Sequence, residues 1–103
     1  MKKKFRNVTL TTKANIWARG GVVSHTFHTA DGKRRTVGII FPGTYQFKTE
    51  CAEKMTITVG LVGFRYGQSR RICLPGDNFK IPDDTEFELI CDVISEYICE
   101  YLE

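Results

Sequence analysis

Long hydrophobic runs and paired cysteines are both missing from this sequence of 103 residues. No apolar run approaches the roughly 20 residues that a membrane-spanning helix needs, and the opening MKKKFRNVTL lacks the apolar stretch of a secretory signal. The cysteines at 51, 73, 91 and 99 form no CxxC pair, which disfavours a zinc ribbon or a thioredoxin-like redox motif. We therefore expect a soluble, cytoplasmic protein that has reduced, mostly buried thiols and no membrane partner.

Helical periodicity is also missing almost throughout the chain. Short alternating runs rich in Val, Ile, Thr, Phe and Tyr recur instead, separated by turn signals such as GG at 20–21, DG at 31–32 and PG at 42–43. About nine strands with turns every 8 to 12 residues indicate a β-sandwich or small barrel. The sequence predicts one all-β domain over 1–103, with residues 1–4 as a flexible basic tail.

Each end of the chain is poor in charge of one sign: acidic residues are scarce in the first part and basic residues in the last. Residues 1–40 carry nine Lys or Arg against Asp31 alone, whereas residues 76–103 carry nine Asp or Glu against Lys80 alone. Neighbouring strands of an antiparallel sheet can pair such charges. Because the basic part lacks the interleaved glycines and aromatics of an RNA-binding strand, we expect no nucleic-acid partner.

The stretch EKMTITVG at 53–60 contains an unexpected carboxylate. In a strand, Glu53 shares one side with Met55, Ile57 and Val59. Burying an ionised group without a partner costs several kcal/mol or more. Glu53 is therefore predicted to line a polar cavity rather than a dry core.

The Asp31-Gly32 pair predicts a two-residue type I′ hairpin turn. Such a turn pairs Thr29 with Arg34, Phe27 with Thr36 and His25 with Gly38, all on one side of the sheet. The apolar members of this set indicate that the side faces inward.

The residues around Glu53 resemble the first motif of the cupin family. Phe47, Thr49, Glu53 and Gly60 follow the spacing X-x-X-x3-E-x6-G, in which both X positions are His in that family. In that family these His residues bind a divalent metal. Here phenylalanine offers no lone pair to a metal, and threonine is a poor ligand for a transition metal.

A second cupin-like motif follows in the expected order. Gly76, Pro82 and Phe87 match its spacing, and Phe87 stands where the family has a further metal-binding His. The two motifs together imply a single-domain, cupin-type jelly-roll β-barrel. We expect its pocket to hold no metal.

Strand parity predicts which side chains face into this barrel. They are Tyr45, Phe47, Thr49, Glu53, Met55, Phe87, Tyr97 and Tyr101. An apolar, aromatic cavity with a few polar groups is typical of a small-molecule site. Each aromatic taken alone fits a filled core better than a binding site, but Glu53 does not.

Nearly the whole chain, from Phe5 to Leu102, resembles the small cupin family of pyrimidine/purine nucleoside phosphorylases. The most specific segments are KAN at 13–15, DGKRRTVG at 31–38, PGTYQFKT at 42–49 and the closing Tyr97-x-Cys99-x-Tyr101. The resemblance implies a homodimeric enzyme without a cofactor. Its reaction would use inorganic phosphate to convert purine and pyrimidine nucleosides into free base and ribose 1-phosphate.

Parity and chemistry suggest individual roles in such a reaction. Glu53 can accept hydrogen bonds from ribose hydroxyls, and Arg34 can bind phosphate with its guanidinium. The remaining candidates are Phe47 and Phe87 for the base, Tyr45 or Tyr97 as donors to base or phosphate, His25 as an acid, and Thr36, Thr49 and Met55 as further pocket residues.

Two other functions fit the same sequence. One is a non-catalytic cupin module that binds a nucleoside or a sugar, which would release no base. The other is a metal-dependent cupin oxygenase or isomerase, which the residues at 47, 49 and 87 disfavour.

Overall fold

Residues 3–103 are described by a computed structural model and form β-strands joined by turns, with one three-residue 3-10 turn and no α-helix among them. The strands are β1 (Thr9–Leu10), β2 (Asn15–Trp17), β3 (Val22–His28), β4 (Arg34–Ile40), β5 (Gly43–Lys48), β6 (Glu53–Val59), β7 (Val62–Tyr66), β8 (Ser69–Cys73), β9 (Asn78–Ile81), β10 (Glu86–Cys91) and β11 (Ser95–Tyr101). The all-β prediction is confirmed. Within the described residues, no helix has the length and hydrophobicity to span a bilayer.

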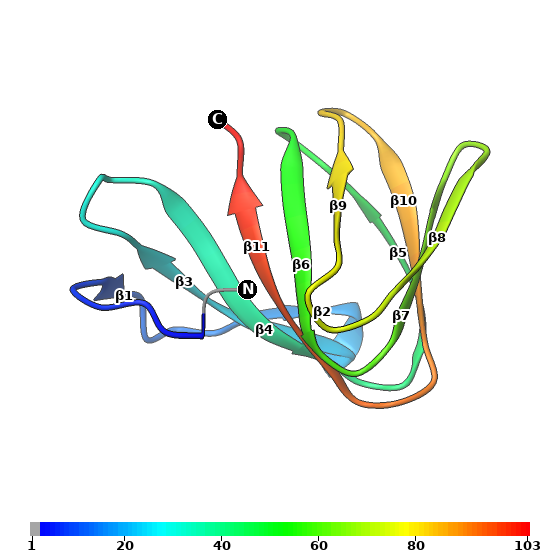
Figure 1. The fold of residues 1–103 in the computed structure, drawn as a ribbon, viewed down its shortest axis with the longest axis horizontal. Coiled ribbons are helices and arrows are strands. Elements are labelled where there is room, and N and C mark those ends of the chain that lie inside the picture. The colour runs from blue at the N-terminus through cyan, green and yellow to red at the C-terminus, as the bar shows by residue number, and fades with distance from the viewer. Residues whose placement is uncertain (1–2) are drawn as a thin grey trace.

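The strands form two antiparallel sheets that face each other (Figure 1). The larger sheet has the order β1-β3-β4-β11-β6-β9, with β2 also paired to β3, and the smaller has the order β5-β10-β7-β8. Each sheet draws strands from distant parts of the chain, as in a jelly roll. The predicted tail is only partly described, since residues 1–2 lie outside the described range; Lys3 and Lys4 are exposed.

The core lies between the sheets and is rich in aromatic rings. Phe64 of β7 stacks on Phe79 of β9 with ring centroids 3.8 Å apart, so this pair joins the two sheets. Ile57 and Leu89 are almost fully buried beside them. Burying one such side chain stabilises the fold by about 1.5–3 kcal/mol, which makes this layer the main link between the sheets.

The apolar alternation of EKMTITVGLV at 53–62 predicts a single strand, but β6 ends at Val59 and Val62 begins β7, which belongs to the other sheet. Gly60 lies between them with φ +94°, a conformation that side chains disfavour. The amide of Leu61 then donates to Ser95 Oγ at 3.1 Å, which fixes the corner. The apolar run continued through this corner, so its hydrophobicity did not reveal the break.

The predicted β3–β4 register is wrong by one residue. Thr26 pairs with Thr36 and His28 with Arg34, because the loop holds Ala30, Asp31 and Gly32 rather than Asp31 and Gly32 alone. The Gly32 amide donates to Thr29 O at 2.8 Å, and Gly32 has φ +83°. This is the three-residue hairpin loop with a type I turn followed by a left-handed residue.

The charge asymmetry of the chain is partly paired across neighbouring strands. Arg35 of β4 lies 3.7 Å from Glu100 of β11, and Arg34 lies 2.6 Å from Glu103. These contacts join the basic first part of the chain to its acidic last part, as the sequence suggested.

Candidate functional site

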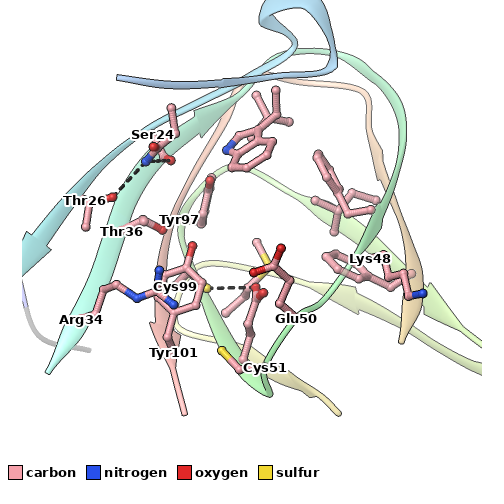
Figure 2. Close-up of a pocket in the computed structure, with 18 residues that line it drawn as sticks. Ser24, Thr26, Arg34, Thr36, Lys48, Glu50, Cys51, Tyr97, Cys99 and Tyr101 are labelled. Atoms are coloured by element: carbon pink, nitrogen blue, oxygen red, sulfur yellow. Dashed lines mark hydrogen bonds between the residues drawn. The ribbon is translucent and has the colours of Figure 1, made fainter. Parts of the chain in front are cut away.

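A cavity of about 350 Å³ opens between the two sheets (Figure 2). Its lining residues are Asn15, Trp17, Val22, Ser24, Thr26, Arg34, Thr36, Phe47, Lys48, Glu50, Cys51, Glu53, Met55, Phe87, Leu89, Tyr97, Cys99 and Tyr101. This volume falls within the range of small-molecule sites in proteins. The mixed aromatic, hydroxyl and charged lining suits a ligand that has both an aromatic and a polar part.

One wall of the cavity consists of rows of inward-facing side chains from β3, β4 and β11. Thr36 pairs with Thr26 on one side and with Cys99 on the other. Alternate residues of a strand share a face, so Ser24 lies above this row and Arg34 below it. Figure 2 shows Arg34, Tyr101 and Cys51 at one end of this wall and Ser24 toward the other.

Glu53 points into the cavity beside a thiol. The Sγ of Cys99 donates to Glu53 Oε1 at 3.3 Å, and the carboxylate is half-buried. Burial raises the pKa of Glu53, although the Cys99 hydrogen bond and the charge of Arg34 act in the opposite direction. The strand-parity prediction that Glu53 faces a polar cavity is thus confirmed by its position.

Arg34 provides the cationic end of the cavity. Its guanidinium carbon lies 3.9 Å from the centroid of the Tyr101 ring, and its Nε donates to Glu103 Oε1 at 2.6 Å. Burial raises the pKa of Tyr101 to about 12, so its hydroxyl stays protonated at neutral pH. The aromatic ring and the carboxylate together hold the guanidinium at the end of the wall.

The opposite wall, from β5 and β10, is aromatic. Phe47 and Phe87 are direct cross-strand partners, with ring centroids 5.7 Å apart and planes tilted by 33°. Leu89 lines the same wall. These side chains offer a flat apolar surface across from the hydroxyl groups of β3 and β4.

Short β2 adds a polar group and an indole ring at the other end. Asn15 Nδ2 donates to Thr26 Oγ1 at 3.0 Å and to Ser24 Oγ at 3.3 Å. Trp17, two residues further on the same strand, also lines the cavity and is 49% exposed. Neither residue was predicted as a site residue, although Asn15 ends the KAN segment at 13–15, which is among the segments most specific to the family.

Seven of the ten candidate residues from the sequence line this one cavity. They are Arg34, Thr36, Phe47, Glu53, Met55, Phe87 and Tyr97. Burial raises the pKa of the Tyr97 phenol, so it remains a hydrogen-bond donor. Their roles in binding or catalysis stay predictions.

The other three candidates lie outside the cavity lining and have structural contacts. The Tyr45 hydroxyl donates to the carbonyl of Phe41 at 2.8 Å. Thr49 is almost fully buried and donates to Pro82 O at 2.7 Å. His25 Nδ1 lies 3.4 Å from Thr11 O.

The prediction that His25 lies on the same face as Arg34 is wrong because of the hairpin register. His25 pairs with Val37, whose side chain is 46% exposed, while the Arg34 and Thr36 face carries Ser24 and Thr26. The one-residue shift therefore places Val22, Ser24 and Thr26 of β3, rather than His25, in the cavity lining.

Two thiols at the cationic end of the cavity were not among the predicted site residues. Cys51 and Cys99 line the cavity, and all four cysteines of the chain are free. Burial raises the pKa of both thiols, so they are neutral at physiological pH. The alternation Tyr97-x-Cys99-x-Tyr101 was the available signal for Cys99; the position of Cys51 after β5 had none.

Among residues 3–103, no group of three or more His, Cys, Asp or Glu is arranged to hold a metal ion.

Known proteins resemble this chain over nearly its whole length. A family model described as pyrimidine/purine nucleoside phosphorylase matches residues 12–101. A protein of that name from Chlorobium chlorochromatii is 37% identical over 100 residues, which cover 96% of this chain and 97% of the relative.

Solved structures support the same fold. A protein of unknown function from Acinetobacter sp. ADP1 superposes with a TM-score of 0.90 at 27% identity, covering 95% of this chain and 97% of the other. An RmlC-like cupin from Shewanella frigidimarina superposes with a TM-score of 0.71 at 13% identity, covering 88% and 83%. The cupin-type fold expected from the two motifs is thereby confirmed. The chain belongs to the pyrimidine/purine nucleoside phosphorylase family.

Proposed function

We propose that this protein cleaves purine and pyrimidine nucleosides with inorganic phosphate, giving free base and ribose 1-phosphate. The observation that carries the proposal is one cavity lined by a guanidinium, a half-buried carboxylate and a pair of phenylalanines. Those groups match the three parts of the reacting system: phosphate, ribose and base. Membership of the family supports the same reaction.

The reaction breaks the bond between C1′ of the ribose and a nitrogen of the base. The electron pair of that bond leaves with the base, and a phosphate oxygen forms the new bond to C1′. The proton that the phosphate loses ends on the base, directly or through water. Positive charge develops on the sugar in between, so a fixed negative group near the ring lowers the barrier.

Glu53 is the proposed sugar-binding carboxylate. It is the half-buried acidic group whose Oε1 accepts the Cys99 hydrogen bond, which leaves further lone pairs for ribose hydroxyls. Its ionised form stabilises the charge on the ring, and the same hydrogen bonds hold C1′ in position for attack. Because burial raises the pKa of Glu53, protonation removes this charge at a higher pH than it would for an exposed glutamate.

Arg34 is the proposed phosphate-binding residue. A guanidinium can bind a phosphate through two parallel hydrogen bonds. Its Nε donates to Glu103, whereas the stacked Tyr101 ring holds the planar group in place without using its hydrogen bonds. Phosphate then competes with the Glu103 carboxylate for this cation.

Phe47 and Phe87 are the proposed contacts of the base. Stacking on phenyl rings accepts any base, because every base has a π-face. Met55 adds apolar surface, and the hydroxyls of Thr36 and Tyr97 add hydrogen-bonding groups within the same lining. Broad base specificity follows from such a surface.

The proposed reaction uses phosphate as co-substrate and needs neither a metal nor an organic cofactor. We also propose a homodimer located in the cytoplasm, as the family resemblance implies. Exposed Val37 and Ile39 on the outer side of β4 support self-association, because apolar patches on a sheet face are typical interfaces.

The test is release of free base from uridine and inosine by chelator-treated protein, with and without phosphate. Release that requires phosphate supports the proposal. Glu53→Gln should lower kcat by about 100-fold or more, whereas Glu96→Gln, at an exposed site on β11, should leave it unchanged.

Base release that is equal with and without phosphate would contradict phosphorolysis. Absence of release, in a protein that binds uridine, would instead identify a non-catalytic nucleoside-binding module. Retention of near wild-type turnover by Glu53→Gln would disprove the sugar-binding role.

A further inference from the structure

The positions of the charged and polar groups along β3 and β4 define a direction in the cavity. Arg34 pairs with His28, and Ser24 is four residues before His28 on the same strand. At about 3.3 Å per residue, these levels are roughly 13 Å apart. The Glu53 carboxylate reaches Cys99, which pairs with Thr36, midway between the two ends.

This order suits a nucleoside that is attacked by phosphate from the side opposite its base. With phosphate at Arg34 and ribose at Glu53, the base extends toward Ser24 and Asn15 at the far end. Resting on the proposed function, we propose that Asn15, together with the Ser24 and Thr26 hydroxyls, recognises the polar edge of the base in both keto and amino nucleosides.

The hydrogen bonds of Asn15 leave one side of its amide for a ligand. Its Nδ2 donates to both hydroxyls, and among residues 3–103 no group donates to its Oδ1. Ser24 is 2% exposed, so its hydroxyl is fixed within the wall, and Asn15 is half-buried. The amide oxygen can accept a hydrogen bond from a ring N–H or an exocyclic amine of a base.

The same cluster can also act as a donor. A hydroxyl both donates and accepts, so both hydroxyls can bond equally well to Oδ1 if the amide rotates by half a turn. The Nδ2 protons then face the cavity and can donate to a carbonyl of the base. A cluster that can either donate to the base or accept from it does not distinguish uridine from cytidine, or inosine from adenosine.

Asn15→Asp tests this mechanism because aspartate only accepts when it is ionised. It should change the ratio of kcat/KM for cytidine over uridine by about tenfold or more in favour of cytidine, whose amine donates where uridine has a carbonyl. The ratio for adenosine over inosine should move the same way. Asn7→Asp carries the same change at an exposed position outside the cavity and should leave both ratios unchanged.

Trp17 supplies a binding measurement that does not depend on turnover. It is the single tryptophan of the chain and lines the cavity, so its fluorescence should respond to cytidine and uridine. The ratio of their dissociation constants should shift in Asn15→Asp as the kcat/KM ratio does.

Thr26→Val, which removes one hydroxyl at similar volume, should weaken binding of both nucleosides and gives a second test if Asn15→Asp fails to fold.

The outcomes separate this inference from the proposed function. Phosphate-dependent turnover with both ratios unchanged within twofold in Asn15→Asp, and with nucleoside binding unchanged in Thr26→Val, overturns the recognition role alone. No turnover, but a shifted Trp17 binding ratio, supports the recognition role and overturns phosphorolysis. If there is no turnover and no fluorescence response to either nucleoside, both the recognition role and the proposed phosphorolysis are overturned.

Discussion

Glu53 shows how a single residue in a sequence can indicate a cavity. Three apolar neighbours on the same strand side made its carboxylate anomalous, and this anomaly predicted a polar surrounding without any structural information. The identity of its partner could not be predicted, because Cys99 reaches it from β11, 46 positions along the chain. A thiol is also a weak donor, so it leaves the carboxylate available for stronger hydrogen bonds.

The pH profile of activity should depend on Glu53. Burial raises its pKa above the ordinary value of 4.5, and the proposed role requires the ionised form. Activity should therefore fall as the pH drops through this raised pKa, giving an acidic limb in a kcat profile for uridine. The same limb should be missing from the residual activity of Glu53→Gln, and its persistence there would assign the limb to another group.

Stability should show the opposite trend at this residue. An acid whose pKa is higher in the folded state contributes stability at low pH and loses that contribution as the pH rises through the folded pKa. Glu53→Gln removes this dependence, so the variant should be stabilised relative to wild type more at pH 7 than at pH 4. Urea denaturation at both values measures the difference, and an equal effect at both would exclude a raised pKa.

Glu103 should compete with phosphate for Arg34. Its carboxylate accepts from Arg34 Nε at 2.6 Å, so removal of its charge should lower the KM for phosphate by a few-fold. Glu103→Gln tests this in a phosphate titration at saturating uridine. The matched change Glu86→Gln, on the outer side of β10, should have no effect, and an unchanged KM in Glu103→Gln would place phosphate elsewhere.

At the scale of elements, the β3–β4 hairpin shows where local sequence rules fail. A DG pair fits the two-residue turn, but it also fits the last two positions of the three-residue loop seen here. Asp31 accepts hydrogen bonds from Thr29 and from the Lys33 amide, which stabilises the longer loop. The two alternatives differ by one residue in register, so one misjudged turn exchanged His25 for Ser24 and Thr26 at the cavity.

Gly38 makes the close approach of β3, β4 and β11 at the cavity possible. A Cβ at this position would lie 2.6 Å from the Val23 carbonyl oxygen and 2.9 Å from Tyr97 Cε1. Because the backbone would have to move, Gly38→Ala should lower the free energy of unfolding by about 1–3 kcal/mol. Gly63→Ala on β7 is the control, since its Cβ would meet Ile90 at an ordinary 3.4 Å. Equal stability of the two variants in urea would contradict this packing.

Strand positions were predictable where the hydrophobic alternation was long, as in 53–59 and 95–101, and these strands carry Glu53 and Tyr97. The stretch ANIWA at 14–18 does predict a strand and forms β2, but three-residue β2, like two-residue β1, is too short for its alternation to show which side faces the cavity. Asn15 and Trp17 reach the cavity only because β2 pairs with β3, a tertiary contact that no local signal encodes. This is why one end of the candidate site was missing from the sequence-based set.

At the scale of the whole molecule, the order of motifs predicted the fold better than any single strand did. Two cupin-like spacings in the correct order were enough for the jelly roll, because the spacing reflects how strands of the two sheets alternate along the chain. The absence of histidine at 47, 49 and 87 also changed the expected chemistry of the cavity. Phe47 and Phe87 line it as an aromatic pair, whereas Thr49 is bonded outside it.

The proposed homodimer can be tested through the outer side of β4. Val37 and Ile39 are 46% and 39% exposed there, and a second copy would cover them. Light scattering should give twice the chain mass for wild type and one chain mass for Ile39→Glu, because a buried unpaired charge disrupts an interface. Ile72→Glu, at a 70% exposed position in the smaller sheet, should remain dimeric. A monomeric wild-type protein would contradict the proposal.

Phosphorus NMR of the products tests the central claim most directly. Chelator-treated protein, uridine and inorganic phosphate should give a phosphate-ester signal of ribose 1-phosphate in amounts equal to the uracil released. The signal should be nearly lost in Glu53→Gln and reduced in an Arg34→Gln variant at low phosphate, but retained in Arg70→Gln, at an exposed position on β8. Uracil released with free ribose and no ester signal, or no uracil at all, would contradict the assignment of this cavity to phosphorolysis.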